Sequence, residues 1–168
     1  MMLVAESCIV ADPPEYRAPG QTRPVLNVYS AVPTATWALV VFPAVKTPFT
    51  VQVRSEDAGE DLRAIFFLDY QLPGESKLIS KSITASTYDN TGRNITYDWF
   101  PDKDKPGCHF VSLVVAHRNS FKQQEDDDHL RPEAAAEDAA IVTWTVNVNP
   151  STDPNTLSNC PSGPAALP

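Results

Sequence analysis

Short runs in which apolar and polar residues alternate constrain this chain more than any other feature. Residues 49–54 place Phe, Val and Val at every second position, and residues 142–148 repeat the pattern with Val, Trp, Val and Val. Successive side chains of a strand point to opposite faces of a sheet, so each run has one buried face and one face in water. These runs predict a β protein whose core is made of sheet faces.

Other apolar runs extend this pattern along the chain. Strands are expected at residues 24–30, 36–42, 49–55, 62–72, 77–87, 95–99, 108–117 and 140–149. The fourth run is apolar on both faces, because Ile65 and Phe67 oppose its main apolar set, which predicts a central strand. The run 77–87 is polar and carries Lys77 and Lys81, which are typical of a protected edge strand.

Seven to eight strands with no long helix between them favour an all-β fold, an antiparallel two-sheet sandwich. A closed barrel is the alternative. The 16 prolines gather toward the two ends of the chain. We therefore expect a leader remnant and proline-rich tether at 1–23, the sandwich at 24–149, and a proline-rich tail at 150–168 that folds back on it.

The charge of the chain is concentrated in one segment. The formal net charge is −8, and residues 125–138 hold seven acidic residues and one basic residue. The rest of the chain is nearly neutral and has no basic stripe that could displace the counterions of a phosphate backbone. Nucleic acid is therefore not an expected partner.

Two of the three cysteines are placed to form a disulfide. In an antiparallel pair, the start of strand 108–117 lies beside the end of strand 140–149, and Cys160 follows that end by 11 residues. The tail can therefore return to Cys108, and a bond between the two sulfur atoms would imply an oxidising compartment. The alternative is that both are free thiols in a reducing compartment.

The order of elements resembles an immunoglobulin-like domain over residues 36–149. A cysteine opens the penultimate strand in Pro106-Gly-Cys-His-Phe110, and Trp144 lies in the last strand. The usual earlier partner cysteine and its packing tryptophan are absent from the expected strands. The resemblance implies the same two-sheet architecture.

The segment around Cys8 resembles the end of a bacterial lipoprotein signal. A small residue, Ser7, precedes the cysteine, and residues 8–16 resemble the mature start of uncharacterised cell-envelope lipoproteins of Gram-negative bacteria. Residues 49–60 and 67–70 are similar to the globular part of such proteins. The resemblance implies that Cys8 is lipidated; the alternative is an unmodified cysteine.

A lipid on Cys8 would make a membrane the partner of the chain. Residues 9–23 in a polyproline-like conformation span about 45 Å, at ~3.1 Å per residue, and would hold the domain clear of the bilayer. In the related lipoproteins an aspartate after the cysteine retains the protein at the inner membrane. Ile9 stands there in this chain, which implies the outer membrane or periplasm; without the lipid the protein would be secreted.

The residues do not suggest a catalytic or metal site. His109 and His117 share a strand face but lie eight residues apart, about 27 Å, so they cannot bind one metal ion and are expected at the rims of the sandwich. The acidic run Glu125, Asp126, Asp127 and Asp128 lacks the spacing and glycine of a calcium loop. Glycine-flanked serines and phosphate-binding loops are absent, so we expect no enzyme, no metal and no cofactor.

The expected function is therefore a non-enzymatic, envelope-anchored domain with a structural or protein-interaction role. The acidic run at residues 125–128 lies in the long connection 119–138, which is the expected contact with another envelope protein, because sandwich domains often bind through their end loops. The edge strand 77–87 could recruit a partner strand instead. The alternative is a secreted carbohydrate- or calcium-binding sandwich.

Overall fold

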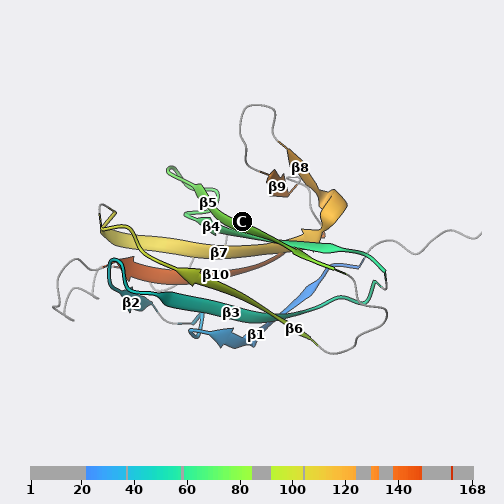
Figure 1. Cartoon of the computed structure of the whole chain (residues 1–168), viewed down its shortest axis with the longest axis horizontal. Coiled ribbons are helices and arrows are strands. Elements are labelled where there is room, and N and C mark those ends of the chain that lie inside the picture. The colour runs from blue at the N-terminus through green and yellow to red at the C-terminus, as the bar shows by residue number, and fades with distance from the viewer. Residues whose placement is uncertain are drawn as a thin grey trace, which may run out of the picture.

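The computed structural model describes residues 22–36, 38–57, 59–84, 92–103, 105–123, 130–132, 138–148 and 160 of the chain. These residues form ten strands and one 3-10 turn (Figure 1). The strands are β1 (Val25–Val32), β2 (Leu39–Val41), β3 (Thr47–Arg54), β4 (Leu62–Leu68), β5 (Ser76–Ile83), β6 (Arg93–Trp99), β7 (Gly107–His117), β8 (Phe121–Gln123), β9 (Leu130–Pro132) and β10 (Ala140–Val148), and the turn is η1 (Arg118–Ser120).

Eight of these strands form two facing sheets. One sheet has the order β1-β3-β6, and the other has the order β2-β10-β7-β4-β5. The two layers lie one above the other in Figure 1, with β3 below and β7 and β10 above. Because β4 pairs with β7 and β3 pairs with β6, the chain crosses repeatedly between layers, which is the strand order of an immunoglobulin-like sandwich.

The predicted all-β, immunoglobulin-like sandwich is confirmed, with one exception to its antiparallel pairing. Short strand β2 runs parallel to β10, with Leu39 opposite Val146. The predicted central strand is β4, which lies between β7 and β5, and the predicted edge strand is β5. The start of β7 lies beside the end of β10, with Cys108 opposite Asn147, as expected from the sequence.

Aromatic rings join the two layers of the core. Phe49 of β3 meets Trp144 of β10 edge to face at 5.2 Å, and Phe66 of β4 meets Tyr97 of β6 at 5.1 Å. Trp144 and Trp99 are both buried, so they are core residues, and Trp144 lies on the buried face that the alternation at residues 142–148 predicts. Aromatic pairs at such distances stabilise a core beyond the area they bury.

The outer face of the five-stranded sheet has an apolar cluster of its own. Phe121, just after β7, packs with residues of β4 and β7 and with Ala139, and β8 and β9 pair there as a small hairpin (Figure 1). The connection 119–138 therefore begins as folded structure. The other buried members of the cluster are Ile65, Phe67, Val114 and Ala116.

Several expected strand boundaries are wrong. The run 62–72 ends as a strand at Leu68, because Asp69 has a φ of 54° and its backbone N–H turns to donate to the carbonyl of Phe110 at 2.7 Å. Of the expected strand 36–42, only Leu39–Val41 forms a strand, because residues 35–36 and 43–44 form turns.

Within the described part of the chain, no helix is long and apolar enough to cross a membrane.

Candidate functional site

His117 is the most densely engaged polar side chain at one end of the sandwich. It ends β7 and is buried, with its Nδ1 atom 2.6 Å from Oδ1 of Asp138 and its backbone N–H donating to Oδ2 of Asp138 at 2.9 Å. Ser120 donates its hydroxyl to the same Oδ2 atom. His117 thus lies at the rim, as expected from the sequence, but it is buried there. Its side chain ties β7, η1 and the entry to β10 together.

Asp57 lies on the opposite side of the same imidazole ring. Its Oδ2 atom is 3.0 Å from Nε2 of His117, although the approach lies outside the direction of an aligned hydrogen bond. The backbone N–H and the hydroxyl of Thr22 donate to the two oxygens of Asp57, each at 2.7 Å. These bonds attach Thr22, at the end of the expected tether 1–23, to the turn after β3.

We call Asp57, His117, Ser120 and Asp138 the His117 cluster. Its two carboxylates lie on opposite sides of the ring, so they do not converge on one point as the ligands of a metal ion must. Among the residues that the structure describes, no group of three or more His, Cys, Asp or Glu side chains could hold a metal ion. The cluster therefore has the geometry of a structural joint.

The cluster also lacks the geometry of nucleophilic catalysis. A serine nucleophile must lie within hydrogen-bond reach of a base, usually a histidine nitrogen. Ser120 instead donates to Asp138, and both ring nitrogens of His117 face carboxylates. The hydroxyl has no base to activate it in this arrangement.

The pKa of Asp138 lies below its ordinary value of 3.8. Burial of the carboxyl raises the pKa, but this effect is outweighed by the hydrogen bonds from Ser120 and His117 and by the positive charge of His117. A lowered pKa in the folded state means that ionised Asp138 stabilises the fold. This stabilisation is fully present above the unfolded-state pKa and is lost as pH falls below it, through the folded-state pKa.

The Asp138→Asn variant is expected to lose about 2 kcal/mol of unfolding free energy at pH 7, because a charge-assisted acceptor of three donors is removed. The difference from the wild type should shrink below about pH 4, where the wild-type carboxyl itself becomes protonated. Urea unfolding at pH 7 and at low pH measures both effects.

Asp98→Asn is the matched control. Asp98 forms a 2.7 Å ion pair with Lys46, but both side chains are well exposed, so its loss should cost less than about 1 kcal/mol. Equal losses for Asp98→Asn and Asp138→Asn at pH 7 would contradict the structural role of the His117 cluster.

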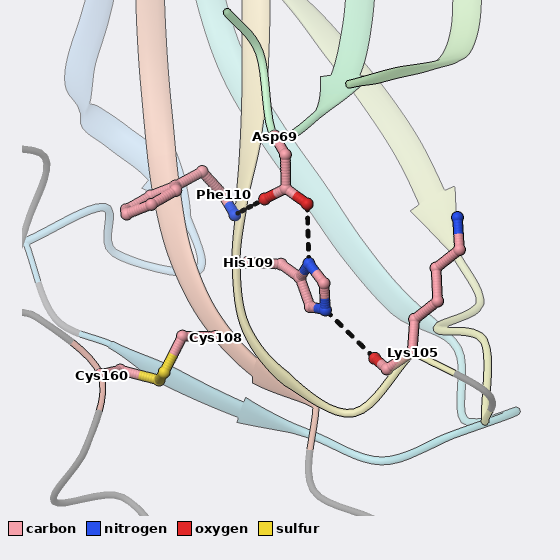
Figure 2. The surroundings of a disulfide bond; sticks show 6 residues. All are labelled: Asp69, Lys105, Cys108, His109, Phe110 and Cys160. Atoms are coloured by element: carbon pink, nitrogen blue, oxygen red, sulfur yellow. Dashed lines mark hydrogen bonds and ion pairs between the residues drawn. A yellow bond between two sulfur atoms is a disulfide. The ribbon is translucent and has the colours of Figure 1, made fainter. Parts of the chain in front are cut away.

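A disulfide marks the other end of the sandwich. Cys108 of β7 is joined to Cys160, with their Cα atoms 5.4 Å apart (Figure 2). This pair is the one suggested by the sequence, and the Cα separation lies in the usual range for a disulfide. The bond ties the chain at residue 160 to the start of β7.

His109 follows the disulfide and is held on both ring nitrogens (Figure 2). Its Nδ1 atom lies 2.8 Å from Oδ2 of Asp69, and its Nε2 atom lies 3.1 Å from the carbonyl oxygen of Lys105. Asp69 also accepts the backbone N–H of Phe110 at 2.9 Å, which closes the turn after β4 against β7. Both ring nitrogens of His109 are therefore engaged in contacts that join β7 to the turn after β4 and to residue 105.

Several residues singled out by the sequence lie outside the described part of the chain. Cys8, the expected lipid anchor, is one of them, and so are the four acidic residues of the expected interaction loop, Glu125, Asp126, Asp127 and Asp128. Most of the tether at 1–23 and of the tail at 150–168 lies outside it as well.

The sequence pattern did not predict the His117 cluster or the Asp69–His109 pair. Asp57 and Asp69 follow strands β3 and β4 in turns, and Asp138 immediately precedes the strand run at 140–149. The sequence carried one signal for these contacts: each acidic residue lies at the end of a strand, and a neighbouring strand carries a histidine. Only the register of β4, β7 and β10 reveals which carboxylate meets which ring.

Comparison with known proteins gives similarity in fold only. No known protein family matches the sequence. No curated protein matches it either. The CARDB domain of a Pyrococcus furiosus protein, solved in complex with di-metal ions, is 10% identical with a TM-score of 0.41, over 67% of this chain and 88% of that domain.

A second similar structure is a chain of the complex between Zinc 2-glycoprotein and Prolactin inducible protein from human seminal plasma. It is 13% identical with a TM-score of 0.42, over 77% of this chain and 97% of that chain. At these identities and TM-scores, the fold assignment depends on the strand order of this protein. That order defines an immunoglobulin-like β-sandwich.

Proposed function

We propose that this chain is a non-enzymatic interaction domain that contacts another envelope protein through the end of the sandwich that carries the β8–β9 hairpin. The observation that carries the proposal is the attachment of the chain on both sides of this hairpin in the sequence. The His117 cluster fixes the chain directly before β8 and directly before β10, and Phe121 is buried against the outer face of the five-stranded sheet. A rigid base of this kind suits a recognition loop, because less conformational entropy is lost on binding.

The charge of the hairpin connection favours a partner with a basic surface. Residues 125–128 are consecutive acidic residues between β8 and β9. A cluster of like charge steers a complementary surface into contact and makes the rate of association depend on salt. The bound state would therefore weaken as ionic strength rises.

We further propose that the domain is held in the bacterial outer membrane or periplasm by a lipid on Cys8. The Cys108–Cys160 disulfide supports an oxidising compartment, in which such bonds persist. The resemblance of the residues around Cys8 to a lipoprotein signal supports the anchor.

Photo-crosslinking in intact bacterial cells tests the interaction. A photoreactive residue at Asp126 should give one defined cross-linked protein, and its yield should fall when Asp127 and Asp128 are changed to Asn. The same probe at Asn94, an exposed residue of β6, is the control and should give none. Equal cross-linking from both positions would contradict a contact at the hairpin.

Intact mass of the membrane-associated protein tests the anchor in the same cells. A diacyl or triacyl group on an N-terminal Cys8 is expected, and the Cys8→Ser variant should leave the membrane fraction. A protein that retains Met1 and carries no lipid would contradict the anchor while leaving the interaction proposal open to its own test.

A further inference from the structure

A cavity of about 240 Å³ lies between the two sheets at the disulfide end of the sandwich. It is larger than the ~150 Å³ cavity that holds one benzene ring and smaller than the ~300–1,000 Å³ pockets of drug-sized ligands. Its volume therefore suits a single six-membered ring with a small substituent.

The walls of the cavity are aromatic on one side and aliphatic on the other. The aromatic wall comes from β6 and the residue after it, and the aliphatic wall comes from β4, β5 and β10. The wall residues are Leu68, Leu78, Tyr97, Trp99, Phe100 and Val148. Tyr97 is held in place by its ring contact with Phe66, and Trp99 by its contact with Phe49 at 6.1 Å.

Some polar groups of the cavity already have hydrogen-bond partners in the protein, and others are available to bind a ligand. His109 lines the cavity, but both its ring nitrogens are used by Asp69 and by the Lys105 carbonyl. Asp102 also lines the cavity and is engaged with a partner of its own. Ser76, Tyr97 and Lys105 line it as well, and no hydrogen bond of their side-chain polar atoms to another described residue occurs. Burial raises the pKa of Tyr97, because the charged form of the side chain is less well solvated there than in the open chain.

We propose that this cavity binds a single aromatic ring that carries a hydroxyl group, the chemistry of a phenol. The ring would lie between the aromatic and aliphatic walls, and its hydroxyl would exchange hydrogen bonds with Ser76, Tyr97 or Lys105. This inference does not depend on the hairpin contact or on a lipid at Cys8, since the cavity lies at the opposite end of β7 from the hairpin.

A sugar ring fits the same volume less well. A pyranose presents hydroxyls around its whole edge, and the available polar groups of the cavity number three. Trp99 is only 5% exposed, so it does not form the open aromatic platform on which a sugar ring stacks. The apolar walls would leave several sugar hydroxyls without partners, which is unfavourable.

Titration of the full chain with p-cresol, followed by ¹H–¹⁵N NMR, tests the proposal. Saturable shifts are expected for the amides around Ser76 and Phe100, with a Kd on the order of 1 mM for so small a ligand. Toluene should bind more weakly than p-cresol, and methyl β-glucopyranoside should not bind.

Two pairs of variants assign the site. Tyr97→Phe removes the hydroxyl and keeps the ring, and should weaken p-cresol binding about fivefold, whereas Tyr29→Phe at a fully exposed tyrosine should not change it. Ser76→Leu fills the cavity and should abolish binding, whereas Ser80→Leu on the exposed face of the same strand should not.

Three results would overturn the proposal: no saturable shift with p-cresol in the wild type, equal p-cresol affinity in folded Ser76→Leu and Ser80→Leu, or binding of the glucoside in preference to p-cresol. The first and third results use only the wild-type chain, so they apply even if a variant fails to fold.

Discussion

The Trp144→Ala variant is expected to lose about 4 kcal/mol of unfolding free energy, the largest effect of any single substitution considered. Trp144 is 1% exposed and contacts Phe49 of the opposite sheet at 5.2 Å. Its indole N–H donates to the carbonyl of Pro33 at 2.7 Å, so the alanine leaves a cavity and an acceptor without its donor. A domain of ordinary stability, about 5–15 kcal/mol, would lose much of its margin.

Equilibrium urea unfolding measures this loss. Trp144→Phe should recover part of the stability, because it restores an aromatic ring but not the hydrogen bond to Pro33. Tyr29→Ala, the same kind of truncation at a side chain that is 98% exposed, is the control and should change stability by less than about 0.5 kcal/mol. If Trp144→Ala were as mild as Tyr29→Ala, Trp144 could not lie between the sheets.

Removal of the disulfide is expected to lower the unfolding free energy by about as much as Trp144→Ala does. The Cys108→Ser/Cys160→Ser double variant should lose about 4 kcal/mol, because the bond closes a loop between residues separated by 52 positions and so restricts the unfolded chain. Cys108 is an exposed side chain, so little packing is lost with its sulfur atom. The loss should therefore appear as a lower midpoint of urea unfolding together with a larger m-value, because the unfolded chain is less compact without the bond.

Peptide mapping without reduction checks the pairing itself. One cross-linked pair of peptides should contain Cys108 and Cys160, and Cys8 should be found in neither. A peptide that links Cys8 to Cys108 would contradict the pairing. A double variant as stable as the wild type would contradict the stabilising role of the bond.

The fold was largely predictable because the buried faces of the strands follow a period of two. Phe49, Val51 and Val53 are all buried in β3, as their alternation predicts. Ile65 and Phe67 predicted the central place of β4, since a strand that is apolar on both faces must be covered on both. In the structure Phe121 of β8 and Ala139 pack on this outer face.

The ends of the elements were less predictable, because local turn geometry overrides the apolar pattern there. Tyr70 and Leu72 continue the period of β4, but Asp69 adopts a positive φ and bonds to Phe110 of β7. Strand β1 departs from regular pairing between Asn27 and Val32, where Ser30 accepts the backbone N–H of Gln52 through its hydroxyl. Side-chain hydrogen bonds of this kind cannot be predicted from the pattern of apolar and polar residues.

The side-chain clusters required the tertiary structure. Asp57 and Asp138 lie far from His117 in the sequence, and the register that brings them to one ring is set by strands β4, β7 and β10. The disulfide was an exception, because adjacent ends of two antiparallel strands place Cys108 and the exit of β10 side by side. A pairing is thus predictable when strand adjacency alone determines it.

Cross-strand NMR contacts test the two-sheet architecture most directly. Backbone contacts are expected from Ile65 to Val114, from Val114 to Ile141 and from Val51 to Ile95, with no backbone pairing between β5 and β6. Continuous backbone contacts between β5 and β6 would mean that the sheets close into a barrel, and helical contacts within 62–68 or 140–148 would contradict the fold altogether.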